Sequence, residues 1–146
     1  MIRAYQEDDF DTLVAVLKLN VPDYFAPSEV DDFIEYLNHE TEDYFVAIEA
    51  GKLIGSGGIN YFYDDKTARI SWDLIHPQYQ GKGIGKKLLQ HRLELLRNNP
   101  NIETVAVRTS QFAYPFYEKS GFVLVKTEKD FWAEGFDLYQ MTLKVK

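Results

Sequence analysis

The N-terminal part of the chain carries apolar residues at helical spacing in two segments. Residues 2–5 predict a short opening strand, and Asp8 or Asp9 then caps a helix that stops before Val21-Pro22. A second helix follows Ser28, which we expect to cap it because an acid stands three positions later. The apolar faces of these two helices are Phe10, Leu13, Val14 and Leu17, and Val30, Phe33, Ile34 and Leu37.

From residue 44 the apolar pattern changes from helical spacing to alternation. Alternation separated by short polar turns predicts an antiparallel meander. In its last strand Ile70, Trp72 and Leu74 alternate with more polar residues, which places these three side chains on one core-facing side. The predicted strands are residues 44–50, 53–63 and 68–75.

The rest of the chain predicts a strand that runs parallel to the meander. An amphipathic helix follows Pro77, with the apolar stripe Ile84, Leu88, Leu89, Leu93 and Leu96. A strand at 102–108 follows, and a strand–helix–strand order implies a right-handed crossover and parallel pairing. A short helix at 113–120 precedes a hairpin formed by 122–129 and 137–145 around the loop 131–136. We therefore predict an α/β (α+β) fold with a mixed, mostly antiparallel central sheet and flanking helices.

Composition indicates one globular domain over residues 1–146. Hydrophobic residues make up 45% and charged residues 27% of the chain, as in ordinary globular proteins. No apolar run reaches the roughly 20 residues that span a bilayer, and the N-terminus has no signal-peptide core. We expect a cytoplasmic protein without a membrane partner. Cysteine is absent and the three histidines lack ligand spacing, so we expect no metal.

The formal net charge of −7 disfavours nucleic acid as a partner, because nucleic-acid binding depends on lysine and arginine that neutralise phosphates. An acidic surface attracts a cationic small molecule such as an amine, although acidity of this size also serves solubility alone.

The most informative stretch is the glycine-rich turn Gln80–Gly85, which leads from a strand end into a helix. Such a turn exposes the first N–H groups of the helix and the positive end of its dipole, which suits an anion. Lys82, Lys86 and Lys87 add positive charge. The turn taken alone is equally consistent with a tight turn and solvated lysines. A P-loop would need Ser or Thr at Lys87, and the preceding meander disfavours a dinucleotide-binding unit.

At this point the sequence resembles the GNAT acetyltransferase superfamily. Gln80, Gly83 and Gly85 match its first signature, and Phe116-Tyr117-Glu118-Lys119-Ser120-Gly121-Phe122 resembles its second. Both lie on the expected elements of a fold that covers essentially the whole chain. The resemblance implies that acetyl-CoA is the cosubstrate and that the parallel strand pair lies at the CoA site.

The resemblance also implies roles for individual residues. The backbone of Asp73, Leu74 and Ile75 would pair with the pantetheine arm, and Tyr117 would protonate the departing thiolate. The family often has an asparagine shortly before this tyrosine, and here Ser110 and Gln111 occupy the region. The expected pyrophosphate contacts are Gln80, Gly81, Lys82, Gly83, Ile84, Gly85 and Lys86.

Several assignments have alternatives in the sequence. Tyr117 either acts as the acid or fills the core, and the general base is Asp73, with Glu49 and His76 as further candidates. Acceptor contacts are expected from Tyr24, Phe25, Asn60, Tyr61, Phe62 and the loop 131–136, and the first two either line a cleft or pack on the core.

We predict an N-acetyltransferase that acts on a primary amine, of a small molecule or a peptide, by direct attack on the thioester. The alternatives are a CoA-binding regulatory module without activity and a nucleotide-binding domain of another class. Exposed aromatic residues of the C-terminal hairpin favour a homodimer.

Overall fold

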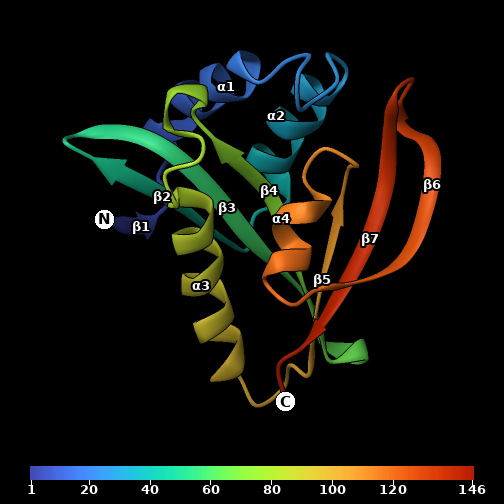
Figure 1. The fold of residues 1–146 in the computed structure, drawn as a ribbon. Coiled ribbons are helices and arrows are strands. Elements are labelled where there is room, and N and C mark those ends of the chain that lie inside the picture. Colours follow the sequence, from blue (N-terminus) through green and yellow to red (C-terminus); the bar gives the residue numbers. More distant parts are fainter.

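A computed structural model describes residues 1–146, which form a seven-stranded sheet with helices on both faces (Figure 1). Neighbouring strands are antiparallel except for β4 and β5, which run parallel. The predicted mixed sheet is confirmed. In sheet order the strands are β1 (Ile2–Ala4), β2 (Asp43–Glu49), β3 (Lys52–Phe62), β4 (Thr67–Ile75), β5 (Thr104–Thr109), β7 (Phe136–Lys144) and β6 (Val123–Ala133).

Two apolar cores lie on opposite faces of the sheet. Helices α1 (Phe10–Leu19) and α2 (Glu29–His39) pack on one face around Phe33. Helices α3 (Ile84–Arg97) and α4 (Tyr114–Lys119) cover the other face, where Leu89 and Leu93 are fully buried (Figure 1). No helix is long and apolar enough to cross a membrane.

Strand β4 contains a bulge that corrects the predicted alternation. The β3–β4 register advances from Ser56 opposite Leu74 to Gly58 opposite Ser71, so β4 carries one extra residue there. Trp72 has a φ of 49°, a left-handed conformation that is rare for an aromatic residue. As a result Ile70 packs on the α3–α4 face and Leu74 on the α1–α2 face, although an unbroken strand would place both on one side.

Two smaller predictions also differ from the structure. Ser28 stands at the N-terminus of α2 but makes no capping bond with its side chain. Glu29 accepts a hydrogen bond from the Ala26 N–H instead, at 2.8 Å. The loop expected at 131–136 is mostly strand, because β6 continues to Ala133 and the turn is Glu134-Gly135.

Candidate active site

Strands β4 and β5 separate at the centre of the sheet. Their parallel pairing joins Thr67–Ile70 to Thr104–Val107 and goes no further, while β4 itself continues to Ile75. The bulge at Trp72 lies just beyond the last pair. Beyond Ile70, β4 therefore has no strand partner on its β5 side, and this edge can accept an extended ligand in place of a strand.

The glycine-rich turn lies at the N-terminus of α3. Gly81 and Gly83 have φ values of 74° and 83°, which glycine adopts without strain. The first N–H to bond back within the helix is that of Lys87, which donates to the Gly83 carbonyl at 3.1 Å. The N–H groups ahead of it have no helical acceptor and can bind an anion. A Cβ added at either glycine would meet no atom within 4 Å, so the turn is open to a ligand.

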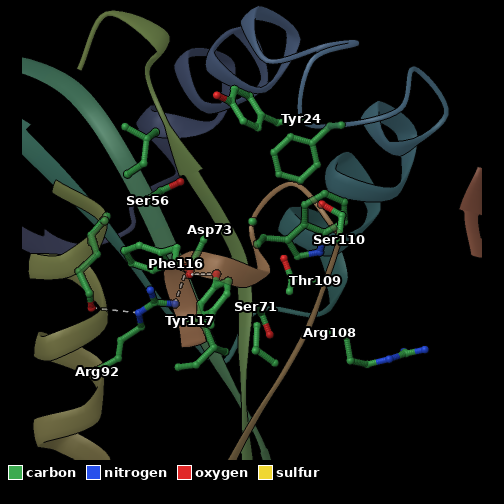
Figure 2. A pocket seen from close by; sticks show the side chains of 18 of the residues that line it. Tyr24, Ser56, Ser71, Asp73, Arg92, Arg108, Thr109, Ser110, Phe116 and Tyr117 are labelled. Atoms are coloured by element: carbon green, nitrogen blue, oxygen red, sulfur yellow. Dashed lines mark hydrogen bonds and ion pairs between the residues drawn. The ribbon is translucent and has the colours of Figure 1, made fainter. Parts of the chain in front are cut away.

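A cavity of about 970 Å³ connects this turn with the gap between β4 and β5. Gly81 and Gly83 line it, and Asp73 and Tyr117 lie near its centre in Figure 2. Aromatic residues of the α1–α2 segment, of β3 and of the C-terminal hairpin line it as well: Tyr24, Phe25, Tyr61, Phe62, Trp132 and Phe136. One continuous space therefore reaches both the anion-binding turn and these aromatic side chains.

Asp73 and Tyr117 are in direct contact at the centre of the cavity (Figure 2). Tyr117 comes from α4 and donates its hydroxyl proton to Asp73 Oδ2. Burial raises the pKa of the Tyr117 phenol well above its usual value; the negative charge of Asp73 and the hydrogen bond to it raise this pKa further, while Arg92 lowers it. Tyr117 is thus protonated at neutral pH and can act as a proton donor.

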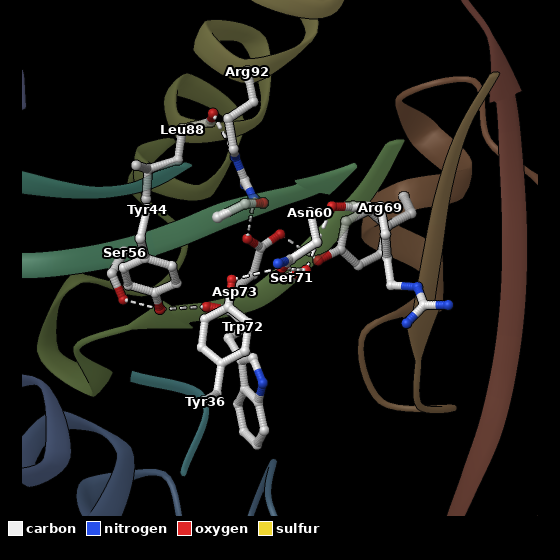
Figure 3. A network of polar contacts seen from close by, with 12 residues as sticks. Tyr36, Tyr44, Ser56, Asn60, Arg69, Ser71, Trp72, Asp73, Leu88 and Arg92 are labelled. Atoms are coloured by element: carbon white, nitrogen blue, oxygen red, sulfur yellow. Dashed lines mark hydrogen bonds and ion pairs between the residues drawn. The ribbon is translucent and has the colours of Figure 1, made fainter. Parts of the chain in front are cut away.

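Arg92 completes this cluster from the face of the sheet that α3 covers (Figure 3). Its side chain is fully buried, and its Nη1 lies 2.6 Å from Asp73 Oδ1. The pair is close but poorly aligned for a hydrogen bond, since Asp73 Oδ1 has no hydrogen-bond partner by geometry. Arg92 instead donates to two backbone carbonyls, those of Leu88 at 3.1 Å and Gly58 at 3.0 Å. Arg92 Nη2 is buried without a partner.

Gly57 makes room for this ion pair. A Cβ built on Gly57 would lie 2.3 Å from Asp73 Oδ1 and 2.7 Å from Arg92 Cζ, which is closer than real contacts allow. Because Gly57 has no side chain, the Asp73 carboxylate and the Arg92 guanidinium can meet on the α3 face of β3.

A second polar network lies on the α1–α2 face beside the bulge (Figure 3). Asn60 Oδ1 accepts hydrogen bonds from Tyr36 at 2.7 Å and from Ser71 at 2.8 Å. The hydroxyl of Tyr44 donates to the Trp72 carbonyl at 2.8 Å. These bonds tie α2 and two strands to the distorted part of β4, and so hold the bulge in place.

The comparison with known families decides the class of protein. A family model described as an acetyltransferase (GNAT) domain matches residues 18–145. The chain belongs to the GNAT acetyltransferase family.

Individual relatives agree with this assignment. An N-alpha-acetyltransferase of Saccharolobus solfataricus is 26% identical over 96% of this chain and 90% of its own length. An acetyltransferase of Sodalis glossinidius is 30% identical over 81% of this chain and 83% of its own length. Among solved structures, an aminoglycoside 6'-N-acetyltransferase complexed with coenzyme A has the same fold, with a TM-score of 0.78 at 14% identity over 100% of this chain and 97% of its own.

Within this GNAT fold, most of the residues predicted for the site line one cavity. Asp73, Tyr117 and Ser110 do so, and so do residues of the glycine-rich turn and the acceptor candidates Tyr24, Phe25, Asn60 and Tyr61. Phe25 stacks on Trp72 with ring centroids 6.0 Å apart, and Tyr24 is exposed. Phe25 therefore packs on the core and also lines the cavity, whereas Tyr24 lines the cavity only.

Other predicted residues have different surroundings. Gln111 accepts from the Asp137 N–H and donates to the Gly135 carbonyl, so its side chain holds the C-terminal hairpin. His76 Nδ1 accepts from the Gln78 N–H at 3.2 Å, within the turn after β4. Glu49 is exposed at the end of β2 and, like His76, does not line the cavity. Asp73 is the one of the three candidate bases that does.

Arg92 was not among the residues predicted for the site. A signal was present, because Arg92 stands four residues after Leu88 and four before Leu96, in the apolar stripe of a helix. A charged residue at such a position is buried only with a partner. Its partner Asp73 lies on another element, which sequence spacing does not reveal.

Proposed function

We propose that this protein transfers an acetyl group from acetyl-CoA to a primary amine, as a single cytoplasmic domain over residues 1–146. The observation that carries the proposal is the contact between Asp73 and Tyr117 inside the cavity that also contains the glycine-rich turn. The free edge of β4 suits the pantetheine arm and the turn suits the pyrophosphate. The solved relative with bound coenzyme A supports the same cofactor.

The contact between Asp73 and Tyr117 supports a proton relay. The neutral amine attacks the thioester carbon, and as the new C–N bond forms, Asp73 takes one proton from the amine nitrogen. Tyr117 gives its proton to the CoA sulfur as the C–S bond breaks, and Asp73 then returns the amine proton to the Tyr117 oxygen. The net result is an amide and a neutral thiol, with both residues unchanged.

The electrostatics of Tyr117 favour a relay over a tyrosine that acts alone. A thiol has a pKa of about 8.5, so a phenol whose pKa lies well above 10 is a poor proton donor to its thiolate. Burial is the largest cause of that increase in the pKa, and the negative charge of Asp73 adds to it. When Asp73 takes the amine proton, that charge disappears and Tyr117 becomes a better acid at the moment it is needed. Arg92 is placed to orient Asp73 through its 2.6 Å contact.

Binding of acetyl-CoA tests the cofactor assignment. We expect calorimetry to detect binding to the wild type and not to Gly83→Val, because valine at a φ of 83° strains the turn and occupies the anion site. Gly51→Val is the matched control, since Gly51 has a φ of 76° in the β2–β3 turn, outside the cavity. If both glycine variants lose acetyl-CoA binding equally, or both retain it, the experiment does not support the turn as the pyrophosphate site.

The C-terminal hairpin also supports the expected homodimer. Val123 and Val125 of β6 are 65% and 55% exposed, and Phe131 is 40% exposed. Sedimentation equilibrium tests this proposal, and a monomer at micromolar concentration would contradict it.

A further inference from the structure

Two arginines lie side by side on the wall of the cavity, on neighbouring strands. Arg69 of β4 stands opposite Ala106 of β5, and Arg108 is the next residue of β5 on that face. Both line the cavity, on the α1–α2 side of the sheet. Diagonal neighbours on adjacent strands have Cα atoms roughly 7–8 Å apart, so two long side chains can reach one ligand group.

Neither arginine has an acidic partner. The ion pairs of the chain are Arg3–Asp9, His39–Glu35, Lys66–Glu103 and Arg92–Asp73. The chain has 23 acidic and only 16 basic residues, so two unpaired cations in one cavity are unexpected. Burial, followed by the positive charge of Arg108, lowers the pKa of the Arg69 guanidinium. Several acids line the cavity, but none forms an ion pair with either arginine, and Glu42 uses its Oε1 to accept from Asn60 and from the Tyr61 N–H.

Aromatic rings hold both guanidinium groups. Arg69 Cζ lies 4.7 Å from the centroid of Phe62, and Arg108 Cζ lies 5.0 Å from Phe131 and 5.7 Å from Trp132. A guanidinium that rests on a ring keeps the N–H groups of its edge available, and these N–H groups match the two oxygens of a carboxylate. The arginines are therefore ordered without an acid and ready for an anionic ligand.

The position of the pair separates it from the reacting atoms. Arg69 precedes Asp73 by four residues in β4, which at 3.3 Å per residue is at most roughly 13 Å of strand and is shortened by the bulge at Trp72. Figure 2 shows Arg108 extending away from Asp73 and Tyr117, and Figure 3 shows Arg69 pointing away from Asp73. An anion held by the pair would thus be remote from the amine that reacts.

We propose that Arg69 and Arg108 bind a carboxylate of the acceptor, so that the substrate is an amine with a carboxylate roughly 10 Å from its nitrogen. This inference rests on the proposed acetyl transfer and adds the class of acceptor. Such a carboxylate belongs either to a long ω-amino acid or to an acidic side chain near the N-terminus of a peptide.

Matched acceptor pairs test the inference. One pair is a peptide with glutamate near its N-terminus and the same peptide with glutamine, and the other is a long ω-amino acid and the alkylamine without its carboxylate. We expect kcat/KM to favour the carboxylate in at least one pair, and the favoured pair identifies the source. Arg69→Met and Arg108→Met should each reduce that preference by about tenfold to a hundredfold, as expected for charge-assisted hydrogen bonds.

The controls separate this inference from the proposed function. Arg97→Met removes an exposed arginine at the end of α3, outside the cavity, and should keep the preference. If amines are acetylated with no preference in either pair, the subsite is wrong and acetyl transfer stands. If no amine is acetylated, calorimetry with the carboxylate-bearing members decides. Binding that Arg69→Met abolishes supports the subsite, and absence of binding overturns it.

Discussion

The buried ion pair between Arg92 and Asp73 predicts unequal effects of removing either charge. Asp73→Asn leaves the Arg92 guanidinium fully buried with only two backbone carbonyls as acceptors. Removing one partner of a buried pair costs about 3–5 kcal/mol. Arg92→Met keeps an unbranched side chain in the same space and leaves Asp73, whose side chain is 20% exposed, bonded to Tyr117. We expect this change to cost less, about 1–3 kcal/mol.

The double variant isolates the interaction itself. With Asp73→Asn and Arg92→Met combined, no uncompensated charge remains in the core. The double variant should therefore be more stable than Asp73→Asn alone, and the coupling energy should be about 2–3 kcal/mol. A domain of this size has about 5–15 kcal/mol of total stability, so each step is measurable.

Urea unfolding at neutral pH, followed by circular dichroism, gives the four free energies by linear extrapolation. Asp64→Asn is the control, because Asp64 is exposed, and it should stay within about 0.5 kcal/mol of the wild type. An Asp73→Asn variant as stable as the wild type, or two single effects that simply add, would contradict a stabilising interaction between Arg92 and Asp73.

The other predictions concern Tyr117, the glycine beside the ion pair, and Asp9, whose side chain pairs with Arg3 and makes none of the predicted capping bonds to α1. Tyr117→Phe should lower kcat by about a hundredfold to ten-thousandfold while calorimetry still detects acetyl-CoA binding. A kcat per folded molecule equal to that of the wild type would show that Tyr117 has only a structural role. Gly57→Ala should cost about 1–3 kcal/mol in urea unfolding, whereas Gly85→Ala, whose Cβ meets its nearest atom at 3.4 Å, should not; equal stabilities would contradict this. Hydrogen bonds from Arg3 lower the pKa of Asp9. The stabilisation of the folded state by ionised Asp9 is complete above pH about 4 and is lost as the pH falls through the lowered pKa of Asp9. Asp9→Asn should therefore reduce the free energy of unfolding by about 1–2 kcal/mol at pH 7 and by less in acid. A reduction that is independent of pH would refute this.

Local periodicity predicted the elements of the fold well. The apolar stripe of α3 and the run of buried residues in β3 depend on burial along a single segment, which a sequence displays directly. The bulge at Trp72 was not predicted, because its conformation is held by bonds from other elements, such as that of Tyr44 to the Trp72 carbonyl. The apolar periodicity of β4 does not reveal contacts from other elements.

The candidate site divides in the same way. The glycine-rich turn and the segment around Tyr117 are continuous in sequence and carry the family resemblance. The pairing of Asp73 with Arg92, and the space that Gly57 leaves for it, join three separate elements. Gln111 was expected at the cofactor, but its side chain forms hydrogen bonds with the backbone of Gly135 and Asp137 in the C-terminal hairpin.

Product analysis shows whether this protein transfers acetyl groups to amines. The purified protein is incubated with acetyl-CoA that carries an isotopic label in the acetyl group, together with the matched peptides and amines described above. We predict that mass spectrometry detects labelled N-acetylated product with equimolar release of CoA thiol, and that Tyr117→Phe greatly slows both. If acetyl-CoA binds but labelled amide forms no faster than in the absence of protein, acetyl transfer is contradicted and a CoA-binding module without activity is favoured.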